Sequence, residues 1–340
     1  MEPHELIEVD RSVKYHAPIL LSYLSGATDA GRASALAVDQ LLTSLPVRRV
    51  ATFDTDMLID YRSHRPSVTI ENWSVVDIDV PEIAIDLVQD DGGVPILVLH
   101  GPEPDAKWQR FSAAVTEFAH EAGVEICVSM MGMPAAVPHT RPTLVHLQST
   151  DPSLVEGQPE MGGAIQFNSS ANTFLQHSLA NAGIEGVNFL AAVPYYMADV
   201  EYPTASLALL ERMASVLDLQ LPKGNIEAGS QDVQNQLKAM VAETAENSNL
   251  VKMLEQHFDE QVSDAAKAIG DFPSPEDFDD AADLKEPPEE KEESVDVDAL
   301  TEAIEQFLAR ATDSDTPPKP DPQADRKPRH RAPKPWELDS

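Results

Sequence analysis

Residues 94–105 read Val94-Pro95-Ile96-Leu97-Val98-Leu99-His100-Gly101-Pro102-Glu103-Pro104-Asp105, and they indicate the fold more clearly than any other stretch. The apolar half predicts a buried strand, and the Gly and Pro residues that follow predict a turn. A helical pattern then covers residues 105–122, a second strand 124–131 and a polar loop 137–142. Polar side chains thus follow the ends of two buried strands, which is where open α/β sheets place ligand crevices.

The rest of the body continues this alternation of strands and helices. Strands are predicted over 18–24, 47–53, 143–147 and 187–193, and helices over 29–44, 171–182, from 203 onward and over 231–262. Residues 67–80 and 82–90 are predicted to pair with each other as antiparallel strands. The pattern predicts an α/β fold with a three-layer, mixed and largely parallel sheet that helices cover on both faces.

Composition divides the chain into three parts. Residues 1–228 are predicted to form the α/β core, and 229–262 a C-terminal helical segment that packs on it and bends or breaks in its polar centre at 246–249. Residues 263–340 are acidic and proline-rich, so we expect a mostly disordered tail that buries too little apolar surface to offset chain entropy. Apolar residues at helical spacing predict a short amphipathic helix at about 297–310, which docks on its own body or on a partner.

Charge limits the classes of partner. The chain has 58 Asp and Glu against 24 Lys and Arg, a net charge of −34, which repels phosphate backbones and anionic lipid. The basic segment 319–334 has no aromatic side chain for stacking on bases, so we expect no nucleic-acid partner. We also expect no membrane partner and a cytoplasmic location, because neither a secretory signal nor an apolar run near the ~20 residues of a membrane helix is present.

Several common signatures of catalytic and metal sites are missing from the sequence. It has no Rossmann glycine pattern, Walker loop, nucleophile elbow or zinc-protease motif, and Gly162-Gly163 is best read as an ordinary turn. His100 and His146 lack partners at metal-ligand spacing, so they predict histidines at the edge of the core. The single cysteine, Cys127, lies in a predicted strand and is expected to be a small buried hydrophobe. We expect no metal and no cofactor.

The best candidate crevice combines His100, Glu103, Asp105, His139 and Arg141. In a catalytic role, His139 would transfer a proton, Arg141 would bind a carboxylate or phosphate, and Glu103 would act as a base or orient the histidine. In the structural interpretation, which we favour, Arg141 pairs with Glu103 or Asp105 and ties two loops together, because ion pairs often hold loops without doing chemistry.

Tyr195 and Tyr196 form a separate candidate. They follow the predicted strand 187–193, and two adjacent side chains cannot both point inward on an extended backbone. We therefore expect one of them to face a groove or a neighbouring subunit.

These pieces resemble the PAC2 family, which is named for a eukaryotic proteasome assembly chaperone. The matching segments are 97–105 with Trp108 and Phe111, 137–142, 193–196, 202–211, and Leu254-Glu255 with Phe258-Asp259. The resemblance implies a fold similar to the phosphorylase/hydrolase-like fold of purine nucleoside phosphorylases, and self-association, for which we expect a trimer. It implies no established catalysis. Archaeal relatives resemble one another in a C-terminal hydrophobic-Tyr-any tripeptide, whereas this chain ends in 336–340, WELDS, so docking on proteasome rings by that route is not expected.

Two functional hypotheses follow. The leading one is a non-enzymatic, cytoplasmic homo-oligomer of the PAC2 type that binds client proteins in an assembly or chaperone-like role. The alternative is an enzyme resembling an ATP-dependent carboxylate-amine ligase that uses Glu103, His139 and Arg141. We favour the first, because the sequence shows neither a Gly-rich lid nor a clear pair of metal-binding carboxylates.

Overall fold

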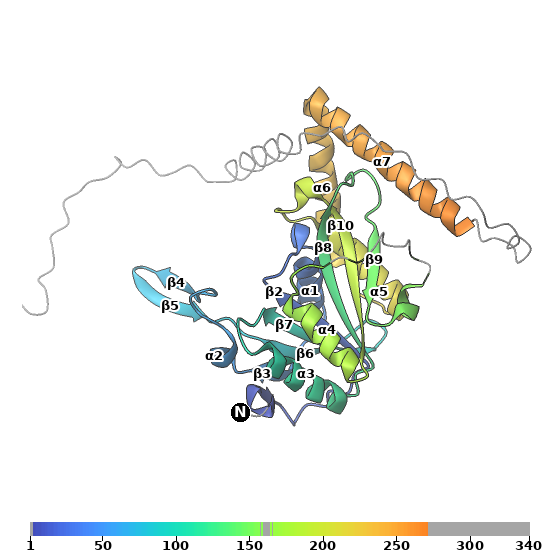
Figure 1. Cartoon of the computed structure of the whole chain (residues 1–340). Helices are drawn as coiled ribbons and strands as arrows, with labels where there is room; N and C mark the ends of the chain where they lie inside the picture. The colour runs from blue at the N-terminus through green and yellow to red at the C-terminus, as the bar shows by residue number, and fades with distance from the viewer. Residues whose placement is uncertain (1–2, 157, 159–163, 165, 271–340) are drawn as a thin grey trace, which may run out of the picture. The chain divides into compact units, whose positions relative to one another are not determined.

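Within the described residues, eight strands form one mixed sheet in the order β1-β3-β6-β7-β2-β8-β10-β9 (Figure 1). The computed structural model describes residues 3–156, 158, 164 and 166–270, so Gly162-Gly163, the predicted helix at 297–310 and all of the predicted tail beyond residue 270 lie outside it. Residues 263–270, which were assigned to the tail, continue the last helix instead. The strands are β1 (Ile7–Val9), β2 (Ile19–Ser25), β3 (Arg48–Phe53), β6 (Ala84–Gln89), β7 (Pro95–Pro102), β8 (Ile126–Ala135), β9 (Val145–Ser149) and β10 (Glu185–Pro194).

The sheet is mixed, as predicted, but only its centre is parallel. Strands β7, β2, β8 and β10 run parallel to one another. The outer pairs β1–β3, β3–β6, β6–β7 and β9–β10 are antiparallel. The expectation of a largely parallel sheet is therefore wrong at both edges. Only β6 and β7 are joined by a short turn, while the other antiparallel neighbours are brought together by longer connections.

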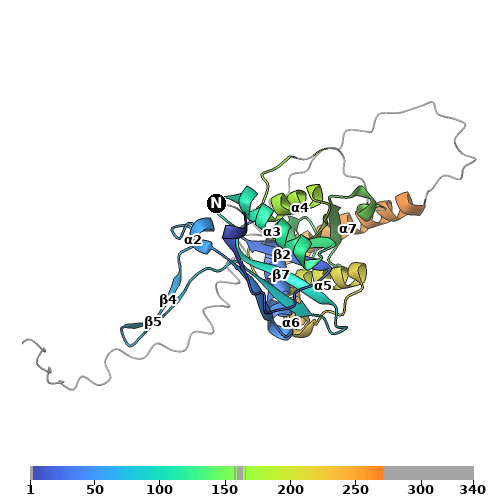
Figure 2. The same ribbon diagram turned by 90° about the horizontal axis from the view of Figure 1, so that it is seen from below.

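Helices cover both faces of this sheet and make the third layer. The helices are α1 (Ala33–Ser44), α2 (Thr55–Leu58), α3 (Trp108–Ala122), α4 (Ala171–Asn181), α5 (Pro203–Leu217), α6 (Gly224–Glu243) and α7 (Ala245–Gly270). Short 3-10 turns are η1 (Pro3–Leu6), η2 (Ala30–Arg32), η3 (Pro152–Val155) and η4 (Tyr195–Met197). Helices α1 and α5 pack together on one face and α3 and α4 on the other, while α6 packs against α1 and α5 (Figures 1 and 2).

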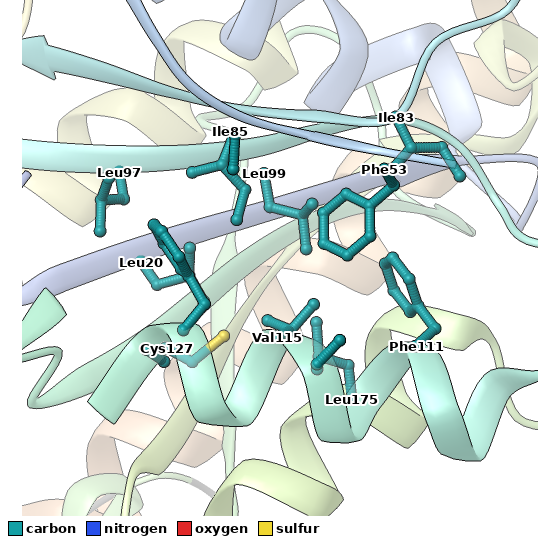
Figure 3. Close-up of a cluster of buried hydrophobic side chains, with 14 of the residues drawn as sticks. Leu20, Phe53, Ile83, Ile85, Leu97, Leu99, Phe111, Val115, Cys127 and Leu175 are labelled. Atoms are coloured by element: carbon teal, nitrogen blue, oxygen red, sulfur yellow. The ribbon is translucent and has the colours of Figure 1, made fainter. Parts of the chain in front are cut away.

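The largest part of the core lies between the sheet and α3. Figure 3 shows Phe111 and Val115 of α3 facing Leu20 and Leu99 of the sheet, and these side chains are buried. The predicted apolar face of α3 is therefore confirmed. Cys127 belongs to the same cluster, as expected of a small hydrophobe, and burial raises the pKa of its thiol to about 12.

Residues 67–79 form a separate hairpin that the sequence did not predict. Strands β4 (Ser67–Glu71) and β5 (Ser74–Asp79) pair only with each other, while β6 pairs with β3 and β7. The predicted pairing of 67–80 with 82–90 is wrong. The reason is the turn at Asn72 and Trp73, which both adopt positive φ (49° and 68°) without the glycine that normally marks such a turn.

The C-terminal helical segment is two helices instead of one. The helix predicted over 231–262 already starts at Gly224 and breaks at Thr244, whose backbone is extended (φ −132°, ψ 144°). The Thr244 hydroxyl accepts a hydrogen bond from Asn247 N (3.2 Å), which caps α7. None of the described helices combines the length and apolar character that crossing a bilayer requires.

Candidate functional site

A cleft of about 250 Å³ opens at the carboxyl end of β2, beside the N-terminal ends of α1 and α4. Its lining comprises Tyr23, Leu24, Ser25, Gly26, Ala27, Thr28, Asp29, Arg32, Ser34, Ala35, Ser129, Met130, Met131, Ser170, Asn172, Thr173 and Asn188. A crevice was predicted past the ends of the buried strands, but none of the five residues named for it lines this cleft.

A row of polar side chains crosses the sheet beneath the cleft. Ser22, Ser129 and Asn188 stand in register on β2, β8 and β10, so they point to the same face. Ser22 Oγ donates to Asn172 Oδ1 (2.7 Å), and Ser129 Oγ donates to Asn188 Oδ1 (3.0 Å). Gln176 of α4 donates to Ser129 Oγ (3.0 Å). This buried network interrupts strands that are otherwise aliphatic.

Two carboxylates hold the helix ends around the cleft. Asp29 accepts hydrogen bonds from the backbone N–H groups of Ser34, Ala35 and Gly132, each 3.0 Å long. Glu103 Oε1 accepts from the backbone N–H of Ala171 (2.6 Å) at the start of α4. Negative charge at a helix N-terminus is stabilising, so Glu103 acts here as a cap behind the cleft wall.

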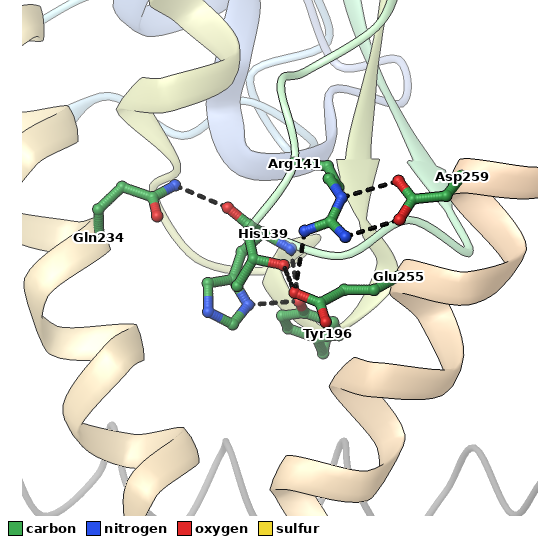
Figure 4. A network of polar contacts seen from close by, with 7 residues as sticks. His139, Arg141, Tyr196, Gln234, Glu255 and Asp259 are labelled. Atoms are coloured by element: carbon green, nitrogen blue, oxygen red, sulfur yellow. Dashed lines mark hydrogen bonds and ion pairs between the residues drawn. The ribbon is translucent and has the colours of Figure 1, made fainter. Parts of the chain in front are cut away.

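Arg141 joins the polar loop to α7. Figure 4 shows its guanidinium forked onto Asp259, with Nε–Oδ1 at 2.8 Å and Nη2–Oδ2 at 2.7 Å. Nη1 also contacts Glu255 Oε1 at 3.1 Å. The predicted pairing with Glu103 or Asp105 is wrong, because β8 continues to Ala135 and the loop contacts the C-terminal helices. The hydrogen bonds to Asp259 raise the pKa of Arg141, which stays charged.

His139 is buried beside the same loop. The hydroxyl of Tyr196 accepts a hydrogen bond from His139 N (2.9 Å) and lies 2.7 Å from Nδ1, while Gln234 of α6 donates to the His139 carbonyl (3.1 Å). Burial lowers the pKa of His139 to about 4, so the ring is neutral at pH 7. We call His139, Arg141, Tyr196, Gln234, Glu255 and Asp259 the loop brace (Figure 4).

The other predicted crevice residues have different partners. His100 Nε2 lies 2.8 Å from Asp86 Oδ2, at the edge of the core as expected. Burial raises the pKa of Asp86, but hydrogen bonds from His100 and Arg49 outweigh this, and the net shift is downward. Asp105 accepts a hydrogen bond from Asp60 N (2.6 Å). The structure thus brings only His139 and Arg141 together, in the loop brace, and gives His100, Glu103 and Asp105 separate partners.

The two tyrosines lie in η4, so the premise of an extended backbone does not hold. Tyr196 is buried in the loop brace. The hydroxyl of Tyr195 is also buried, and no hydrogen-bond partner for it is present among the described residues. The rings meet edge to face at 5.4 Å between centroids. Neither hydroxyl opens to a groove.

The hairpin β4–β5 presents the largest exposed apolar surface of the described residues. Register pairs Val68 with Ile78 and Ile70 with Val75, which places these four on one face, the apolar face of the hairpin, with 52–60% exposure each. The opposite face carries Ser67, Thr69, Glu71, Ser74, Asp77 and Asp79, and Val76, which is 52% exposed, is the unpaired residue where the register shifts. Trp73 is fully exposed at the tip. Figures 1 and 2 both show the hairpin extending away from the sheet.

Comparison with known families decides the relationship. The sequence model of the PAC2 family matches residues 23–241. The chain belongs to the PAC2 family. A Mycobacterium tuberculosis protein of unknown function, Rv2714, is 33% identical over 77% of this chain and 92% of its own, with a TM-score of 0.72. A Corynebacterium glutamicum protein of unknown function is 33% identical over 76% and 98%, with a TM-score of 0.71.

A third PAC2-like structure carries a functional name. The M. tuberculosis proteasome-assembly chaperone homologue Rv2125 is 24% identical over 68% of this chain and 99% of its own, with a TM-score of 0.63. At that identity the likeness establishes the shared fold. No match was found among curated proteins. Among the described residues, no group of three or more His, Cys, Asp or Glu side chains is placed to hold a metal ion.

The residues that line the cleft of this PAC2 chain were not predicted from its sequence. A signal was present, because Ser22, Ser129 and Asn188 each interrupt an apolar strand. These three polar residues can be recognised as one group only when the strand register is known, because they are far apart in the chain and lie in one row only in the folded sheet.

Proposed function

We propose that this PAC2 protein is non-enzymatic and works by binding other protein chains, in an assembly or chaperone-like role. The family supports this proposal, and one related structure is named as a proteasome-assembly chaperone homologue. The observation that carries it is the apolar face of the hairpin, which lies open on the described chain.

The hairpin has the pattern of a sheet that packs on something. Alternation of apolar and polar residues along a strand stabilises a structure only when the apolar face is covered, and an isolated two-stranded hairpin is marginal in water. Asn72 and Trp73 hold left-handed backbone conformations, which asparagine tolerates but which cost a residue such as Trp73 about 1 kcal/mol or more. A hairpin tip with backbone strain and a fully exposed tryptophan is consistent with a surface that contacts another protein chain.

A second copy of the chain is the occupant that we propose for this face. The carboxylates of the hairpin, Glu71, Asp77 and Asp79, all lie on the opposite face. Copies that each carry a net charge of −34 can therefore meet at the apolar face without placing carboxylates against each other. We therefore propose a homo-oligomer, with a trimer as the expected state. Client proteins would bind to surfaces that exist only in this oligomer.

The test is affinity capture from a lysate of the source organism with the tagged full chain. Three baits are compared: the native chain, the apolar-face variant Val68→Thr/Ile70→Thr/Val75→Thr/Ile78→Thr, and the polar-face control Thr69→Ser. We expect the native chain and the control to retain the same protein partners in repeated experiments, and the apolar-face variant to lose them. Repeated capture of no protein by the native chain would contradict the proposed function.

The finer expectations about fold and boundaries belong to the same proposal. We propose the phosphorylase/hydrolase-like class for the sheet, a division at 1–228, 229–262 and 263–340, and a cytoplasmic location. Within the described residues, Glu103 contacts α4 while His139 and Arg141 contact the C-terminal helices, so no observation favours the ligase hypothesis.

A further inference from the structure

We propose that the cleft at the end of β2 binds a compact, uncharged, polyhydroxylated molecule of the monosaccharide class. This inference goes beyond the proposed protein-binding function and concerns a different surface. It starts from polar groups that the fold buries at the cleft and leaves with unused hydrogen-bonding capacity.

Two amide side chains and one hydroxyl supply that capacity. Asn188 is 6% exposed, and its Oδ1 accepts from Ser129 while its amide nitrogen has no partner among the described residues. Asn172 is arranged similarly, with Oδ1 bonded to Ser22 and its amide nitrogen unpartnered within the described chain. Ser34 is 2% exposed and its hydroxyl likewise has no described partner. All three residues line the same cleft.

Charge in the cleft favours an uncharged ligand. Asp29 is saturated by three backbone N–H groups, and Arg32 is paired with Glu201 at 2.7 Å. Among the described residues that line the cleft, no unpaired cation therefore remains to bind a phosphate or carboxylate, and the net charge of −34 repels anions at longer range. Neutral donors that remain after the charges have been paired match hydroxyl oxygens as acceptors.

Size and shape narrow the class further. A volume of about 250 Å³ corresponds to roughly eight waters at ~30 Å³ each, which is smaller than the usual site for a drug-sized ligand. Tyr23 adds a half-buried aromatic ring to the wall, and burial raises its pKa to about 12, so its hydroxyl keeps its proton as a donor. Several neutral donors and an aromatic ring in one small cleft suit a small ring that carries several hydroxyls.

Ligand-observed saturation-transfer NMR on the full chain tests the proposal, with thermal shift as the second readout. The probes are glucose, galactose, mannose, ribose and myo-inositol at millimolar concentrations, with glucose 6-phosphate and glucosamine as charged controls. Thr28→Trp fills the exposed mouth of the cleft. Asn172→Asp keeps the acceptor for Ser22 and replaces the free donor by an oxygen. Asn181→Asp makes the same change at the exposed far end of α4.

We expect at least one neutral probe to bind the native chain and the Asn181→Asp control. Thr28→Trp and Asn172→Asp should weaken that binding at least tenfold, and Asn172→Asp should stay folded because a carboxylate near the start of α4 favours the helix. Absence of binding by every neutral probe overturns the proposal. Equal binding of glucose 6-phosphate also overturns it, because the site would then not select uncharged ligands. Binding that survives Thr28→Trp overturns it as well, because the ligand would then bind outside the cleft.

Discussion

Tyr195 and Tyr196 are neighbours in sequence with opposite hydrogen-bonding states. The Tyr196 hydroxyl bonds to His139 twice, whereas the Tyr195 hydroxyl is buried without a partner in the described chain. Removing a satisfied buried hydroxyl leaves its partners unpaired, while removing an unsatisfied one relieves a desolvation cost.

The pair gives a matched test by urea unfolding. Tyr196→Phe should lower the free energy of unfolding by about 1–2 kcal/mol, because it strands the buried His139 N–H. Tyr195→Phe should leave it unchanged or raise it, and it serves as the control for loss of a hydroxyl in the same turn. Equal destabilisation by the two substitutions would show that the Tyr195 hydroxyl has a partner in solution.

His139 makes stability depend on pH. Its pKa falls from the ordinary 6.5 to about 4 through burial, so the unfolded chain takes up the proton first as the solution is acidified. The contribution of the neutral ring is complete above pH 6.5 and is lost as the pH falls toward 4. His139→Gln should therefore lose less stability than the native chain between pH 7 and pH 4.5. Denaturant unfolding at both pH values measures this, with exposed His120→Gln as the control. A native-like pH slope in His139→Gln would assign the acid sensitivity to other groups.

At the scale of single residues, the sequence predicted which side chains are buried better than it predicted which side chains interact with each other. Cys127 and Phe111 lie in the core as predicted, because period and hydrophobicity report which face a residue occupies. The partner of Arg141 was predicted wrongly, because a long side chain pairs with whatever the fold brings near it, and α7 is more than 100 residues away in the chain.

Among the elements, α7 is tied to the polar loop by the loop brace and also buries Val251, Leu254 and Phe258. Forked arginine–carboxylate pairs are stronger than single contacts, and Arg141 reaches two carboxylates of α7. The hydrogen bond from Arg141 lowers the pKa of Asp259, so this contribution is present above the ordinary pKa of 3.8 and is lost as the pH falls further.

Hydrogen exchange can measure that docking. Arg141→Ala should make the backbone amides of α7 exchange several-fold faster at neutral pH, while those of α3 stay unchanged, because only α7 loses its contact with the loop. Glu260→Gln removes the neighbouring exposed carboxylate and is the control. Unchanged protection of α7 in Arg141→Ala would mean that apolar packing alone holds the helix.

The hairpin prediction concerns oligomer mass. Light scattering after size exclusion should give the native chain a mass above the 37.1 kDa of one copy. The apolar-face variant Val68→Thr/Ile70→Thr/Val75→Thr/Ile78→Thr should elute near one copy, because threonine keeps the β-propensity and removes most of the apolar contact. Thr69→Ser should retain the native mass. A native chain of monomer mass at micromolar concentration would exclude a second copy as the occupant.

Helices and strands were predicted correctly where the spacing of apolar residues and the Gly or Pro residues that end an element gave the same boundaries. Helix α3 ends at Gly123, which has positive φ, and its apolar face follows the predicted spacing. The hairpin was missed because Asn72-Trp73 carries no glycine. The break in the C-terminal helical segment was expected in its polar centre at 246–249, and the structure places it at Thr244, two residues earlier.

For the whole molecule, salt should strengthen self-association. Each copy carries a net charge of −34, and the proposed contact face is uncharged, so added ions screen repulsion without breaking ion pairs across it. Sedimentation velocity at about 0.02 and 0.2 M NaCl, between which the Debye length falls from roughly 20 to 7 Å, should show tighter association at the higher concentration. Weaker association at high salt would instead indicate an interface built from opposite charges.

The overall architecture was predicted better than its edges. Alternating strands and helices predicted an α/β fold with a covered mixed sheet, and the PAC2 match agrees. The antiparallel edges and the cleft lining depend on register between distant segments, for which a single sequence carries no local signal.

The open hairpin also bears on how the cell would treat copies made in excess. In the proposed homo-oligomer, a subunit in contact with its neighbours would cover residues 67–79, whereas an unassembled copy displays two unpaired strand edges and the exposed Trp73. Chaperones and proteases bind exposed apolar side chains and unpaired strand edges of this kind in newly made chains. Exposure of the hairpin would then mark copies that have not assembled, and copies made in excess of the complex would be degraded.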